Sequence, residues 1–194
     1  VENCKFLVPT ADIGLVASLI RLFESLIDSV FCLSAQDIDK TYGSKMPFLV
    51  LESQFLFAVI WSIGGSVDTA GRELFSEFLR NFIVGKSIGN TAETEEESSS
   101  TSEGEKEKSK KPKLPHKFQK ALPTKDILHD YMFDIADGDW KHWMTTVPEH
   151  KIPREISFHE IIVQTTDTVR YSYLLDTLLL HQKPVLFVGP TGTG

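Results

Sequence analysis

Apolar residues recur every three or four positions through the first part of the chain, the spacing that places side chains on one face of an α-helix. The first such stretch follows Pro9, and Thr10 or Asp12 is its expected N-cap, because short side chains that accept hydrogen bonds favour that position. The stripe consists of Leu15, Val16, Leu19, Leu22, Phe23, Leu26 and Ile27. This pattern predicts a first amphipathic helix.

Two more helices are predicted before residue 90. Residues 51–63 form the second, which ends at Gly64 and Gly65. Asp68 is the expected N-cap of the third, and Gly85 lies just beyond its end, where a left-handed residue commonly closes a helix. The expected inner face of the third helix is Leu74, Phe75, Phe78, Leu79 and Phe82. Together the three helices predict a small all-helical bundle over residues 1–89.

Alternation replaces the helical spacing within residues 116–153, which we interpret as a connecting segment. The alternating positions are His129, Tyr131, Phe133 and Ile135. Asp137-Gly138 follows as a turn signal, so a short β-hairpin is expected. Trp140 and Trp143 come next, and their rings either dock on a neighbouring surface or stack on a ligand base. Packing is the commoner role of such residues.

Residues 154–194 are predicted to run from an extended segment over residues 158–165 through one helix into a strand. Thr166 or Asp167 is the expected N-cap of the helix. Its apolar stripe is Tyr171, Leu174, Leu175, Leu178 and Leu179. Pro184 follows the helix, and the apolar residues 185–188 predict a strand.

The stretch over residues 90–115 has almost no large apolar side chain, and its acidic, Ser/Thr-rich half is followed by a lysine-rich half. Such a composition cannot offset conformational entropy by burial, which predicts a disordered charged linker. It serves either as a tether or modification site, or only as a variable solvated loop.

Overall composition excludes several classes of function. A net charge of -7 opposes a nucleic-acid partner. The longest apolar run, residues 55–61, is far shorter than the ~20 residues that span a bilayer, so no membrane partner is expected. The six histidines lack metal-ligand spacing, and no metal site or catalytic triad is predicted.

The motif with clear chemical meaning follows the predicted strand and consists of Gly189, Pro190, Thr191, Gly192, Thr193 and Gly194. It fits the G-x-x-x-x-G part of a P-loop. Glycines there let consecutive backbone N–H groups point at phosphate oxygens, and a following helix adds its positive dipole end. The complete motif continues with a Lys and a Ser or Thr. No compact domain is expected to end on this loop, so we interpret the chain as a fragment.

The whole pattern resembles dynein heavy chains. Residues 166–176 (TDTVRYSYLLD) and 183–194 (KPVLFVGPTGTG) are similar to the entry of the third AAA+ module of that family. Residues 56–65 (LFAVIWSIGG) resemble the helical lid that closes the second module, and residues 140–143 (WKHW) resemble the connecting segment of axonemal members. The similarity covers nearly the whole chain outside residues 90–118.

The resemblance implies a mixed, mainly α fold with four parts. These are the helical lid of the second module (residues 1–89), the disordered charged linker (90–115), a connector with a short β-hairpin (116–153), and the truncated start of the α/β P-loop domain of the third module (154–194). It also implies that Gly189 to Gly194 contact phosphate through their backbone. Candidate adenine contacts, with edge packing as the alternative, are Ile161, Ile162, Val163 and Thr165.

The resemblance further implies a parent protein that moves toward microtubule minus ends by ATP hydrolysis, in the cytoskeleton of the ciliary or flagellar axoneme. Its expected partners are neighbouring AAA+ modules, microtubules, and dynein intermediate and light chains. ATP or ADP with Mg²⁺ is the expected cofactor of the complete module. The fragment lacks the Walker lysine, so tight binding and hydrolysis are not expected of it. The alternatives are a helical interaction segment that binds no nucleotide, and a truncated, unrelated P-loop NTPase.

Overall fold

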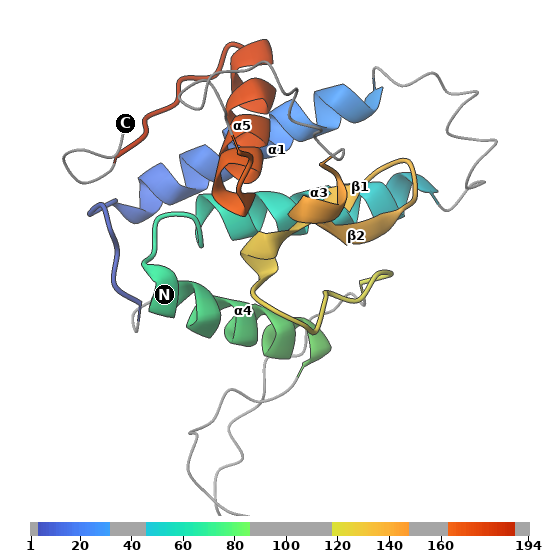
Figure 1. Cartoon of the computed structure of the whole chain (residues 1–194), viewed down its shortest axis with the longest axis horizontal. Helices are drawn as coiled ribbons and strands as arrows, with labels where there is room; N and C mark the ends of the chain where they lie inside the picture. The colour runs from blue at the N-terminus through green and yellow to red at the C-terminus, as the bar shows by residue number, and fades with distance from the viewer. Residues whose placement is uncertain (1–3, 32–45, 86–117, 148–162, 189–194) are drawn as a thin grey trace, which may run out of the picture.

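A computed structural model describes residues 4–31, 46–85, 118–147 and 163–188, which form a mainly helical structure with one small antiparallel sheet (Figure 1). The α-helices are α1 (Asp12–Phe31), α3 (Met46–Ser62), α4 (Thr69–Val84) and α5 (Thr166–Leu180). Two 3-10 helices, η2 (Leu128–Asp130) and η3 (Trp143–Thr145), flank the strands β1 (Tyr131–Asp134) and β2 (Asp139–His142). The predicted mainly α fold with a β-hairpin is confirmed; the linker over residues 90–115 lies outside the described residues.

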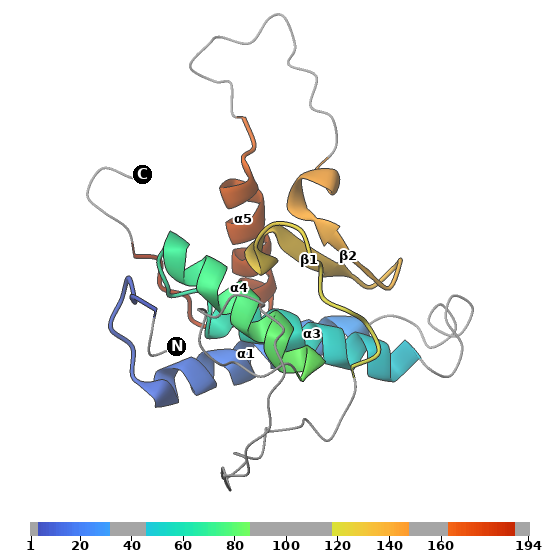
Figure 2. The same cartoon turned by 90° about the horizontal axis from the view of Figure 1, so that it is seen from below.

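Helix α3 is the centre of the core. Its residues Phe57, Ala58 and Ile60 are at most 1% exposed. α1 packs along α3, while α5 crosses α1 and contacts η3 (Figures 1 and 2). A helix that is apolar on most of its sides is stable only when it is covered on those sides. The covering elements come from both ends of the chain, so the first and last helices share one core.

The predicted stripe of α1 is largely confirmed. Leu15, Leu22 and Leu26 are buried, whereas Val16 is half exposed. The expected caps are not used, because the backbone carbonyl of Ala11 accepts the first helical hydrogen bond, from the N–H of Leu15. Asp12 instead lies in the first turn, where its charge interacts favourably with the helix dipole.

Both predicted ends of α4 are confirmed. Asp68 caps the helix by accepting a 2.8 Å hydrogen bond from the N–H of Gly71. Gly85 closes it with φ = 72°, a left-handed conformation that favours glycine. The predicted inner face is partly wrong, since Phe75 and Leu79 are buried but Leu74 and Phe78 are 50% and 40% exposed.

The error has a geometric cause. The predicted positions of α4 are displaced around the helix axis from the face that is buried, because that face includes a polar residue, Ser76, which an apolar pattern does not count. Ser76 shows which side faces inward: it is 1% exposed and its Oγ accepts a hydrogen bond from the N–H of Leu128 in η2. The buried face is therefore centred between Phe75, Ser76 and Leu79.

The β-hairpin has the predicted turn. β1 and β2 pair antiparallel, with Phe133 opposite Trp140 and Asp134 opposite Asp139. Gly138 adopts φ = 63°, which the turn requires. Lys141 forms ion pairs with Asp134 and Asp137 across the turn; its hydrogen bond lowers the pKa of Asp134 and raises that of the lysine.

The expected strand over residues 185–188 is not formed within the described part of the chain. The residues run without regular structure, and Leu186 and Val188 are 83% and 63% exposed. A parallel strand needs neighbouring strands to satisfy its backbone hydrogen bonds, and the described residues supply none beside it. The apolar pattern is therefore present without the pairing that would turn it into a strand.

Candidate functional site

The predicted phosphate-binding residues, Gly189 to Gly194, lie outside the described residues, as do Ile161 and Ile162. Val163 and Thr165 are described and immediately precede α5. The side chain of Val163 is 68% exposed, so it is available for an apolar contact. The predicted site thus has two parts: residues 161–165, which precede α5 in the sequence, and residues 189–194, which follow it.

Thr165 is the N-cap of α5, in place of the predicted Thr166 or Asp167. Its Oγ1 accepts a hydrogen bond from the N–H of Thr168, and the Oγ1 of Thr168 accepts one from the N–H of Thr165. This reciprocal arrangement satisfies two backbone donors at the start of the helix. The hydroxyl and N–H of Thr165 are thereby used, which leaves its methyl group for contact with a ligand.

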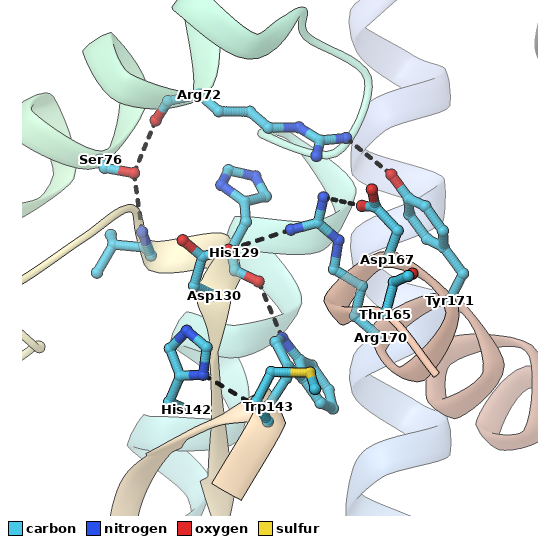
Figure 3. Close-up of polar contacts among 12 residues, drawn as sticks. Arg72, Ser76, His129, Asp130, His142, Trp143, Thr165, Asp167, Arg170 and Tyr171 are labelled. Atoms are coloured by element: carbon cyan, nitrogen blue, oxygen red, sulfur yellow. Dashed lines mark hydrogen bonds and ion pairs between the residues drawn. The ribbon is translucent and has the colours of Figure 1, made fainter. Parts of the chain in front are cut away.

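Arg170 ties the first turns of α5 to the rest of the structure (Figure 3). Its Nη1 lies 3.3 Å from Oδ1 of Asp130 in η2, and its Nη2 pairs with Asp167 on its own helix. The guanidinium lies 5.7 Å from the centroid of the Trp61 ring and 5.3 Å from that of Tyr171. Carboxylates and aromatic faces both stabilise a buried cation.

A second arginine reaches the same helix from α4. Nη2 of Arg72 donates to the hydroxyl of Tyr171 at 3.3 Å (Figure 3). The same nitrogen lies 3.5 Å from the backbone carbonyl oxygen of Gly65. The Tyr171 ring also meets Phe187, with centroids 6.3 Å apart, in the segment that leads toward the P-loop. Tyr171 therefore contacts both α4, through Arg72, and the segment that follows α5 in the sequence, through Phe187.

His129 lies buried beneath these two arginines. Because a carbonyl oxygen can only accept, its Nε2 must carry the hydrogen that bonds to the carbonyl of Gly64 at 3.0 Å. Burial, together with the positive charges of Arg72 and Arg170, lowers the pKa of His129 to about 3. The imidazole is consequently neutral at neutral pH.

Trp143 fastens the hairpin to the core beside His129. Its ring is completely buried, and its Nε1–H donates to the backbone carbonyl of His129 at 2.9 Å (Figure 3). The ring contacts Phe57 of α3 and Tyr173 of α5, with centroids 6.1 and 5.3 Å away. The packing interpretation of this tryptophan is confirmed. Burial also raises the pKa of the Tyr173 phenol.

The other end of α5 is held at the surface. Nζ of Lys183 lies 2.8 Å from Oε2 of Glu24 on α1, and both side chains are partly exposed. Such pairs contribute little, because water screens them. Residues 183–188, which lead to the P-loop, thus follow a helix that is packed on the core, but the ion pair at their start stabilises them little.

Sequence reasoning did not single out Arg170, Asp130 or His129 as members of one cluster. The contact between Arg170 and Asp130 joins residues 40 positions apart, so no local spacing could reveal it. One signal was available: Arg170 lies one residue before Tyr171, at the edge of the apolar stripe of α5. A charge at such a position often needs a buried partner.

The described residues contain no group of three or more His, Cys, Asp or Glu side chains arranged to hold a metal ion. Within the same part of the chain, no helix is both long and apolar enough to cross a membrane.

Comparison with known families divides the chain into two matched regions. Residues 1–145 match the dynein heavy chain AAA lid domain, and residues 150–194 match the P-loop containing dynein motor region. The boundary falls between the hairpin and the approach to α5. The cluster around Arg170 therefore lies where the two matched regions meet.

Individual relatives agree. Dynein axonemal heavy chain 3 of Homo sapiens is 32% identical over 198 residues, which cover 99% of this chain and 4% of the relative. Human dynein axonemal heavy chain 12 is 36% identical over 76% of the chain, again 4% of the relative, and human dynein axonemal heavy chain 2 is 28% identical over 100% of the chain and 3% of the relative. The chain thus spans about 4% of the length of these relatives.

Proposed function

The chain belongs to the dynein heavy chain family, and on that premise we propose that it joins the lid of one AAA+ module to the nucleotide-binding P-loop of the next. The observation that carries this proposal is the order of the two matched regions, lid over residues 1–145 and P-loop region over 150–194. The docking of α5 against α3 and η3 supports it, because the helix that leads to the P-loop packs on the lid.

The nucleotide would be held by two groups of residues. Backbone N–H groups of Gly189 to Gly194 would contact the phosphates, while Ile161, Ile162, Val163 and Thr165 would line the adenine side. The exposed side chain of Val163 fits an apolar contact with a base. Mg²⁺ and the terminal phosphate require the Lys and Ser or Thr that complete the motif. A 194-residue polypeptide alone is therefore expected neither to bind ATP tightly nor to hydrolyse it.

The wider role follows from the relatives. They are axonemal dynein heavy chains, which supports a parent protein that acts as an ATP-driven motor on microtubules in cilia or flagella. We assign the lid to the second AAA+ module and the P-loop to the third. Its partners would be the adjoining modules, microtubules, and intermediate and light chains.

The test is nucleotide binding by a polypeptide that continues past Gly194 through the rest of the P-loop module. Fluorescent ATP would be titrated with and without Mg²⁺. We expect saturable, Mg²⁺-dependent binding that is lost when the lysine expected after Gly194 is replaced by Ala. The 194-residue polypeptide is the control and should show neither tight binding nor hydrolysis. A folded longer polypeptide without saturable binding would contradict the proposal.

A further inference from the structure

We propose that Arg170 is a positioning residue for the nucleotide site: with Asp130 and Asp167 it forms a clamp that holds residues 163–165 where they contact the adenine base. We call Arg170, Asp130 and Asp167 together the Arg170 clamp. The inference rests on the proposed function, in which Val163 and Thr165 lie on the adenine side of the site.

The first argument is burial. Among the Lys, Arg, Asp and Glu side chains that the structure describes, Arg170 alone is buried, with 8% of its surface exposed. A guanidinium taken out of water is unfavourable unless charges and hydrogen bonds compensate it. The position of Arg170 is therefore specified by its partners, and replacing either Asp130 or Asp167 should alter the position of the guanidinium.

The second argument is the origin of the partners. Asp130 belongs to η2 and Asp167 to the first turn of α5 (Figure 3). Trp61, whose ring contacts the guanidinium, belongs to α3. The residues of η2 and α3 lie in the region matched by the lid domain, and those of α5 lie in the region matched by the P-loop. The Arg170 clamp thus spans the junction and fixes the start of α5 relative to the lid.

The third argument is the short path from the clamp to the base-contacting residues. Asp167 lies two positions after Thr165, whose side chain and backbone are both engaged with Thr168 in the capping box. The backbone carbonyl oxygen of Thr165 also accepts a 3.0 Å hydrogen bond from the N–H of Val169. Residues 163–165 therefore continue directly from a turn that the clamp immobilises. An adenine site made by these residues depends on the clamp for its geometry.

The far end of α5 offers a matched control. Lys183 and Glu24 form an ion pair of the same chemical kind at 2.8 Å, but their side chains are 28% and 54% exposed. Lys183 follows the C-terminal end of α5, whereas residues 163–165 lie immediately before its N-terminal end. Breaking the pair should leave the adenine side unchanged.

The experiment is photolabelling of the intact heavy chain with 8-azido-ATP, followed by trypsin digestion. Trypsin releases residues 155–170 as one peptide, which reads this site separately from any other nucleotide site in the chain. We expect label within residues 163–165. Asp130→Asn, which leaves the peptide unaltered, should raise the half-saturating concentration for its labelling about tenfold, the effect of a 1.4 kcal/mol loss. Lys183→Gln should change it less than twofold.

Inorganic tripolyphosphate distinguishes positioning from general damage. Its inhibition constant against the label should be the same in wild type and Asp130→Asn, because it uses only the phosphate side. Arg170→Lys keeps both the charge and the trypsin site but loses the planar fork, so it should give a smaller rise. It also provides the test if Asp130→Asn does not fold.

Three results would overturn the inference. Unchanged labelling in both variants would show that the clamp does not position the base-contacting segment. Equal weakening of azido-ATP and tripolyphosphate would show that it only supports the fold. Absence of label from residues 155–170 of the wild type, with P-loop binding intact, would refute the adenine contacts of the proposed function and the clamp's role with them.

Discussion

Burial sets the protonation state of His129. In the unfolded chain this histidine titrates near pH 6.5, whereas in the folded protein the surrounding core and two arginines lower its pKa to about 3. Between these values the unfolded chain binds a proton that the folded protein does not. The contribution of neutral His129 to the free energy of unfolding is therefore fully present well above pH 6.5, and it is lost progressively as the pH falls toward 3.

We predict that the free energy of unfolding falls by about 2 kcal/mol between pH 7.5 and pH 5 through His129, with a slope that approaches about 1.4 kcal/mol per pH unit once the pH is well below 6.5. His129→Gln removes the titration but keeps an N–H that can donate to the carbonyl of Gly64. The variant should be less stable at pH 7.5 yet lose less stability on acidification. Urea unfolding followed by tryptophan fluorescence at both pH values measures this. Equal pH slopes for the two proteins would contradict the assignment.

At the scale of elements, Trp143 is one of the side chains that attach the hairpin to the helices. Trp143 combines complete burial with a hydrogen bond to the carbonyl of His129. Trp140 packs on Phe133 across the strands, with ring centroids 5.5 Å apart, but its Nε1 has no partner among the described residues. The two tryptophans thus differ in whether the indole N–H forms a hydrogen bond that stabilises the fold.

Replacing each tryptophan by phenylalanine tests this difference. Trp143→Phe leaves the buried carbonyl of His129 without its donor and reduces packing, so we expect a loss of about 2 kcal/mol. Trp140→Phe removes no hydrogen bond and should cost less than about 1 kcal/mol. Urea unfolding followed by circular dichroism provides both values. Similar losses would mean that the hydrogen bond of Trp143 contributes little to stability.

At the scale of the whole molecule, apolar surface collects at residues 186–188. Leu186, Phe187 and Val188 are 83%, 58% and 63% exposed. Three consecutive exposed apolar residues usually mark a surface that something covers. In the proposed function, the remaining strands of the P-loop module pair with this segment.

We therefore expect the 194-residue polypeptide to bind the dye 1-anilinonaphthalene-8-sulfonate more strongly than a polypeptide that continues through the P-loop module. The reason is the burial of residues 186–188 in the completed sheet. Leu186→Ser combined with Val188→Ser in the short polypeptide should lower its dye fluorescence toward that of the longer one. Fluorescence that is equal in the short and long polypeptides would show that this segment stays uncovered.

Several features could be predicted because they depend on neighbours in the sequence. Asp68 and Gly85 act within one turn of α4, and Asp137-Gly138 turns the hairpin over four residues. The apolar spacing of α1 likewise predicted its buried side. The caps, the turn and the stripe follow local hydrogen-bonding or spacing rules that one short stretch satisfies. The family was indicated by four segments in combination: residues 56–65, 140–143, 166–176 and 183–194.

Other features required the tertiary structure. Which side of α4 faces inward depends on η2. Thr165 is the cap of α5, while Asp167 lies in the first turn and pairs with Arg170. The strand over residues 185–188 needs partner strands that its own apolar pattern cannot supply. The sequence by itself determined the turn, the family and the approximate positions of the helices, although α3 begins at Met46 and not at the predicted residue 51. The tertiary structure decided which polar groups meet, because Arg170 and Asp130 are 40 residues apart and only the packing of α5 on the lid brings them together.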